Sequence, residues 1–84
     1  MKLINIGFNN MISRDRVVAL LSYDSAPAKR LVQDAKDSGR ALDCSGGKKT
    51  KTVIITDSGH IVLSSLEGEK LSERISDTPK EEEW

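Results

Sequence analysis

A glycine- and lysine-rich segment, residues 45–51 (SGGKKTK), is the clearest place in the sequence for chemistry. Adjacent glycines let backbone N–H groups approach an anion closely, and the lysine ammonium groups and threonine hydroxyl that follow suit phosphate oxygens. The spacing of glycine and lysine differs from that of a nucleotide-binding P-loop, and no long helix begins there. We interpret the segment as a flexible basic hairpin tip that contacts phosphates through Lys48, Lys49 and Lys51. A solvated glycine turn between strands is the alternative, and both stay open at this point.

Two arginines, Arg14 and Arg16, stand just before an apolar run and add cations to this picture. We expect Arg16 to contact phosphate and Arg14 to be peripheral. An arginine at the end of a strand is also commonly part of a surface salt bridge, here with Asp15 or Asp24 as partner.

Cys44, Asp57 and His60 are the only residues that could form a nucleophile, base and orienting group. No motif surrounds them, so we interpret Cys44 as a small apolar residue at a strand end and His60 as a hydrogen-bonding residue beside a turn. With one cysteine and one histidine, neither an intrachain disulfide nor a zinc site of ordinary ligand spacing is expected. The sequence therefore predicts no catalytic residues, no enzyme, no metal, no cofactor and no small-molecule ligand.

The charges of the 84-residue chain cancel overall but are unevenly distributed. Residues 1–65 hold ten Lys/Arg against six Asp/Glu, whereas residues 66–84 hold three against seven. A basic body with an acidic end is typical of a protein that meets a polyanion, and a solvated terminus that aids solubility is the alternative. The longest mainly apolar run, residues 17–21, is too short to span a bilayer, and no export signal is visible, so we expect a soluble cytoplasmic protein.

The pattern of apolar, turn and capping residues predicts a small α+β domain with a mixed or antiparallel sheet, one main helix and a C-terminal helix, in the order β-β-α-β-β-β-α. The main helix is capped by Ser25, has Pro27 in its first turn and ends at Gly39. The turn Asp57-Ser58-Gly59 predicts an antiparallel hairpin between the strands on either side. The predicted strands are residues 3–6, 16–22, 41–44, 51–56 and 60–65, and the C-terminal helix is residues 67–75.

The continuous apolar run of residues 17–21 predicts that the strand 16–22 is buried on both faces, in a sheet covered mainly on one face. A domain of this size buries only about 60–65% of the surface that its unfolded chain exposes, so its core is marginal. Because neither a disulfide nor a metal is expected to compensate, we expect self-association. The core is expected to include Val18, Leu20, Leu31, Val53, Ile55 and Val62.

Three groups of residues resemble a known family of bacterial proteins, the RemA-like extracellular matrix regulatory proteins. The resemblance covers the domain, residues 1–75, and leaves residues 76–84 as an acidic, flexible tail. The groups are the opening MKLINIGF of residues 1–8, Ser25-Ala26-Pro27 followed by Lys29-Arg30 and Ala35, and Asp57-Ser58 followed by HIVLS at residues 60–64.

The resemblance implies a DNA-binding transcriptional regulator of biofilm matrix genes that assembles into rings. It implies basic contacts before the apolar strand and in the glycine loop, which fall here on Arg16, Lys48 and Lys49, with Lys51 close by. The family loop typically carries paired arginines where this chain has Lys48 and Lys49, and lysine keeps the charge but lacks the bidentate fork. Asn9 stands where a glycine is usual, and residues 44–46 also depart from the family pattern.

The sequence thus predicts a homo-oligomeric, sequence-tolerant binder of double-stranded DNA that acts as a transcriptional regulator. The alternative is an oligomeric adaptor whose basic face binds an acidic protein partner. Salt dependence separates them, since duplex binding weakens steeply as salt rises.

Overall fold

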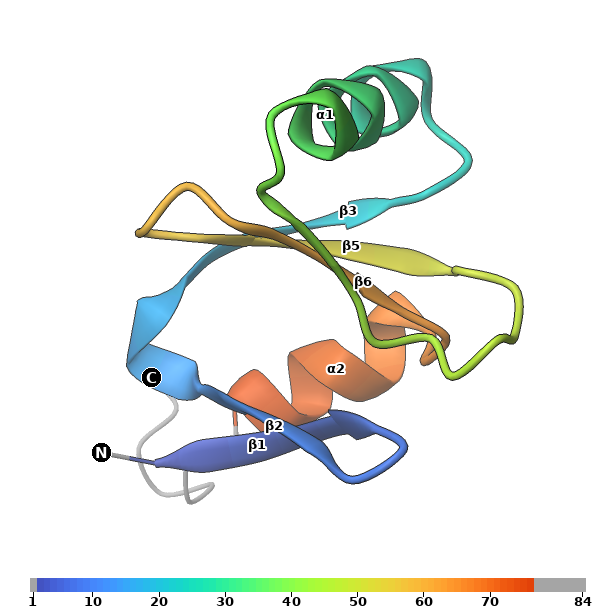
Figure 1. Ribbon diagram of the computed structural model, residues 1–84. Coiled ribbons are helices and arrows are strands. Elements are labelled where there is room, and N and C mark those ends of the chain that lie inside the picture. Colours follow the sequence, from blue (N-terminus) through green and yellow to red (C-terminus); the bar gives the residue numbers. More distant parts are fainter. Residues whose placement is uncertain (1, 77–84) are drawn as a thin grey trace.

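The computed structural model describes residues 2–76, in which two sheets and two helices form an α+β fold (Figure 1). This confirms the predicted fold class. The predicted acidic tail lies outside the described residues, apart from residue 76. Neither helix of the described part is long and apolar enough to cross a membrane. The elements are β1 (Leu3–Gly7), β2 (Asn10–Ser13), a 3-10 turn (Arg14–Arg16), β3 (Val17–Ser22), α1 (Ala26–Asp37), β4 (Ala41–Asp43), β5 (Thr52–Thr56), β6 (Ile61–Ser64) and α2 (Gly68–Ile75).

The central sheet has four strands in the order β3-β5-β6-β4. Strand β5 pairs antiparallel with β3 and with β6, whereas β4 pairs in parallel with β6, so the sheet is mixed. The turn between β5 and β6 needs a residue with positive φ, and Gly59 supplies it at 84°. The predicted hairpin is confirmed.

Helix α1 covers one face of this sheet (Figure 1). The Ser25 hydroxyl accepts from the Ala28 N–H at 3.2 Å, as expected of an N-cap. At the other end, Gly39 has a φ of 74°, and the N–H groups of Gly39 and Arg40 donate to carbonyls of the last turn. Both predicted boundaries are therefore confirmed. The helix packs on β5 and β6 through Ala28, Val32 and Ala35, together with Val53, Ile61 and Leu63.

The β1–β2 hairpin and α2 cover the opposite face of the sheet (Figure 1). Leu71 of α2 is fully buried between the hairpin and the sheet. The second cluster combines Ile4, Ile6, Ile54, Val62 and Leu71. The expectation that the sheet is covered mainly on one face is wrong, because the N-terminal hairpin forms a separate small sheet that returns over it.

Four further sequence expectations are wrong. Strand β2 was not expected, although it pairs antiparallel with β1, with a shift of register between Asn5 and Gly7. Strand β3 lies at the edge of the sheet and holds no fully buried residue, since it has a neighbour on one side only. Val18 is 64% exposed because the register with β5 shifts between Val17 and Ala19, which leaves Val18 in a bulge. Leu31 is 37% exposed and lies at the border of the α1 contact face.

Candidate nucleic-acid interface

The glycine loop, residues 44–51, connects β4 to β5. These strands lie on either side of β6, so the loop crosses the end of β6 and closes no hairpin. The expectation of a hairpin tip is therefore wrong. The last residue of the loop already pairs as a strand residue, because Lys51 donates to the Ser64 carbonyl at 2.9 Å and accepts from the Tyr23 N–H at 3.1 Å. Only the middle of the loop is free of ladder hydrogen bonds.

The first half of the glycine loop is anchored by Asp43. Its Oδ1 accepts from the Ser45 hydroxyl at 2.6 Å and from the Ser45 N–H at 2.9 Å. These two hydrogen bonds favour the ionised carboxylate and lower the pKa of Asp43. The chain then turns through Gly46 and Gly47, whose φ values of 65° and 82° favour glycine. Ser45 is buried, so the backbone is held in place just before the segment that carries the lysines.

Beyond this turn lies a basic groove of about 470 Å³. Lys48 and Lys49 are exposed and have no carboxylate at ion-pair distance within residues 2–76. The Lys51 Nζ lies 3.8 Å from the Glu67 Oε1, and both side chains are more than half exposed, so this pair contributes little to stability. The basic groove is lined by Gly7, Phe8, Lys48, Lys49, Lys51, Ser65 and Leu66. The structure thus brings the three predicted lysines to one surface.

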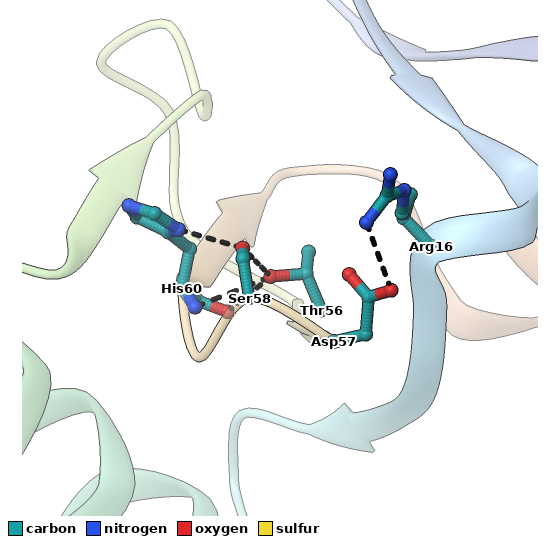
Figure 2. Close-up of polar contacts among 5 residues, drawn as sticks. All are labelled: Arg16, Thr56, Asp57, Ser58 and His60. Atoms are coloured by element: carbon teal, nitrogen blue, oxygen red, sulfur yellow. Dashed lines mark hydrogen bonds and ion pairs between the residues drawn. The ribbon is translucent and has the colours of Figure 1, made fainter.

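Arg16 lies at the other end of the sheet, beside the turn between β5 and β6 (Figure 2). Its Nη1 donates to the Asp57 Oδ2 at 3.2 Å, and its carbonyl accepts from the Asp57 N–H at 2.9 Å. Lys51 and Asp57 flank the two ends of β5, a separation of about 20 Å along an extended strand. The structure therefore does not bring Arg16 and the lysines together within one copy. The salt-bridge alternative holds for Arg16, with Asp57 in place of Asp15 or Asp24.

Arg14 is more enclosed than Arg16, with a side chain 29% exposed. Its Nε lies 4.0 Å from the Asp15 Oδ1, and its N–H donates to the Lys2 carbonyl at 2.8 Å. The hydrogen bond to Lys2 ties the 3-10 turn to the residue that precedes β1.

Comparison with known proteins matches residues 3–75 to the family described as RemA-like, Extracellular matrix regulatory protein A-like. The chain belongs to the RemA-like family. It is 53% identical over 83 residues to a protein of Dictyoglomus turgidum, across 99% of this chain and 98% of that protein. It is 46% identical over 82 residues to a protein of Clostridium botulinum, across 98% of this chain and 90% of that protein. Both relatives carry the name "putative regulatory protein".

The residues considered for catalysis do not form a set in this RemA-like chain. Asp57 pairs with Arg16, whereas the His60 Nδ1 lies 2.7 Å from the Ser58 Oγ within the turn (Figure 2). Cys44 follows the last residue of β4, at the end of the sheet away from this turn, and its N–H donates to the Leu63 carbonyl. Partial burial, and secondarily the Asp43 carboxylate, raise the pKa of the Cys44 thiol, which disfavours the nucleophilic thiolate.

Phe8 is the residue of the basic groove that the sequence analysis missed as a site residue. It is half exposed, and the Lys48 Nζ lies 5.9 Å from the centre of its ring. A large apolar residue in a polar turn, next to Gly7 and Asn9, was the available signal.

Proposed function

We propose that this RemA-like protein is a homo-oligomeric regulator that binds double-stranded DNA through the basic groove. The observation that carries the proposal is the convergence of Lys48, Lys49 and Lys51 on one surface, with Lys48 and Lys49 unpaired with carboxylates among residues 2–76. An ammonium group with no neighbouring carboxylate is available to replace the counterions of a phosphate backbone. The names of its relatives support a regulatory role, and the family description supports extracellular matrix genes as the target.

One copy offers only a few phosphate contacts, which is the reason to include self-association in the proposal. Each neutralised phosphate contributes about −0.9 to the slope of log affinity against log salt, so three lysines give weak and salt-sensitive binding. Several linked copies raise the overall affinity by about 100-fold or more without new contacts. Arg16 fits this arrangement as a contact at the far end of each copy, provided that a phosphate replaces Asp57 as its partner. A ring would present both ends repeatedly to a duplex.

Light scattering of the purified protein, alone and with a duplex of about 40 base pairs, tests oligomerisation and binding together. The expected result is a discrete oligomer that captures the duplex at low salt and releases it as salt rises. An oligomer that ignores duplex at every salt concentration would contradict the DNA proposal and favour the adaptor, whose acidic partner would then be sought. A protein that stays monomeric would contradict the proposal that self-association raises the affinity for duplex.

Charge reversal assigns the binding to the groove. The double substitution Lys48→Glu and Lys49→Glu should abolish duplex binding and leave the oligomer intact, since both side chains are exposed. The matched control is Lys29→Glu with Arg30→Glu, which makes the same change of net charge on exposed positions of α1. Equal losses in the two double variants would show that only net charge matters, and an unchanged affinity in the first would remove the glycine loop from the interface.

A further inference from the structure

Phe8 occupies a backbone position that does not suit its side chain. Strands β1 and β2 pair up to Gly7 and Asn10, which leaves Phe8 and Asn9 as a two-residue turn. Both have positive φ, 53° and 63°, as a tight hairpin turn requires. Asparagine tolerates this conformation, whereas a bulky residue adopts it at a cost. Turn geometry alone therefore does not explain a phenylalanine at this position.

The ring of Phe8 packs against the glycine loop, 38 residues further along the chain. A methyl group built on Gly46 would lie 2.6–2.7 Å from the ring atoms Cγ, Cδ1 and Cδ2. Real side chains do not approach so closely, so the ring rests directly on the Gly46 Cα. A methyl group built on Gly47 would meet nothing within 4 Å. Glycine is needed at position 46 for two reasons: its φ of 65° disfavours other residues, and the Phe8 ring leaves no room for a side chain.

The same ring reaches Lys48. The Lys48 Nζ lies 5.9 Å from the ring centroid, within the range of a cation–π interaction. The turn that carries Phe8 is itself held by Asn5 and Asn10: the Asn5 Oδ1 accepts from the Gly7 N–H at 2.7 Å, and the Asn10 Nδ2 donates to the Gly7 carbonyl at 3.1 Å. The β1–β2 hairpin therefore holds the ring, and the ring contacts both the glycine turn and the first lysine after it.

We propose that Phe8 is the positioning residue of the basic groove, and that it fixes the glycine loop through Gly46 and orients the Lys48 ammonium toward the bound phosphate. This inference rests on the proposed DNA binding and adds a residue from a distant part of the chain to that site. It also explains why Phe8 is half exposed: one part of the ring covers Gly46, and the remainder forms a wall of the groove.

The substitution Phe8→Asn separates the role of the ring from the stability of the turn. Asparagine favours the positive φ of this position, so the hairpin should remain folded although the contact of the ring with Gly46 is lost. The matched variant Phe8→Tyr keeps the ring and should behave as the wild type. Duplex affinity, measured at several salt concentrations, should fall about two- to fivefold in Phe8→Asn, the range expected of an exposed cation–π contact. In a Lys48→Ala background, the same substitution should reduce affinity by a smaller factor, because only its effect on the glycine loop remains.

The NMR signal of Gly46 reports the contact without DNA. The Gly46 Hα that points into the ring should be shifted upfield in the wild type and in Phe8→Tyr, and should return to its ordinary position in Phe8→Asn. A wild-type protein with this shift but no duplex binding would overturn the proposed function and, with it, the role of Phe8 toward phosphate. Duplex binding with an ordinary Gly46 shift, or with equal losses for Phe8→Asn in both Lys48 backgrounds, would overturn the positioning role alone.

Discussion

Removal of the Ser64 hydroxyl should weaken the attachment of the β1–β2 hairpin to the central sheet. Ser64 is fully buried in β6, and its Oγ donates to the Ile6 carbonyl at 2.7 Å while accepting from the Leu66 N–H at 3.1 Å. This single side chain joins the hairpin, the sheet and the segment that leads into α2. It also lies behind the basic groove, because Gly7, Ser65 and Leu66 line that groove.

The substitution Ser64→Ala leaves two polar groups without their partner. A buried group that loses its hydrogen bond costs about 1–3 kcal/mol. The Ile6 carbonyl is enclosed and bears most of this cost, while the Leu66 N–H is nearer to solvent, so we expect a loss of about 2–3 kcal/mol in total. A domain of this length has a free energy of unfolding of about 4–13 kcal/mol. The loss is therefore a large fraction of the whole, and should lower the melting temperature by about 8–24 °C.

Chemical denaturation at one fixed protein concentration measures this loss, since association changes apparent stability. Ser72→Ala on the exposed face of α2 is the matched control and should stay within about 0.5 kcal/mol of the wild type. A change of that small size in Ser64→Ala would refute the reasoning. Amide hydrogen exchange should locate the effect in β1 and β2, and uniform acceleration over the whole sheet would contradict a local weakening of this attachment.

Two further predictions concern titrating groups near the glycine loop. Ser45→Ala should raise the Asp43 pKa toward its ordinary value, followed by NMR titration of the carboxyl carbon, because the largest cause of the lowering is the Ser45 hydroxyl. The pKa of Asp43 is lower in the folded state than in the unfolded state, so Asp43 stabilises the fold above the unfolded pKa, and this stabilisation is lost as pH falls through the folded pKa. In Ser45→Ala the loss of stability at acid pH should therefore be smaller. An unchanged Asp43 pKa in this variant would contradict the role given to the Ser45 hydroxyl. The paired substitution Cys44→Ala and His60→Ala should leave duplex affinity unchanged in a gel-shift titration, and a tenfold loss would show that the loop end or the turn contributes to binding.

The elements that could be predicted from the sequence are those whose signals are local. Ser25 and Gly39 mark the two boundaries of helix α1 because cap residues act within a few positions of their own backbone. The turn before β6 was equally evident from Asp57 to Gly59. The lysines of the basic groove were found for the same reason, since Lys48, Lys49 and Lys51 are close in sequence and the loop keeps them together.

The features that escaped prediction depend on which segments meet across the fold. The apolar run of β3 is typical of a central strand, but strand order placed it at an edge, and a bulge turned Val18 outward. Strand β2 was missed because its turn uses Phe8 and Asn9 in place of the usual Asn-Gly pair. The ion pair of Arg16 with Asp57 spans 41 residues. Proximity of this kind cannot be obtained from local patterns.

The glycine loop differs from the flexible tip that its composition indicates, and the difference bears on affinity. Asp43 and Ser45 hold its start, the Phe8 ring rests on Gly46, and Lys51 already pairs within the sheet. Ordering a mobile loop on binding costs about 1–2 kcal/mol for each residue whose backbone becomes fixed, in addition to about 0.5–1.5 kcal/mol for each long side chain. Because the backbone under Lys48 and Lys49 is fixed before a phosphate arrives, only the side chains themselves remain to be ordered. Repeated over several copies, this smaller cost favours the proposed assembly, in which each copy makes few contacts with duplex. It is also consistent with the positioning role proposed for the Phe8 ring.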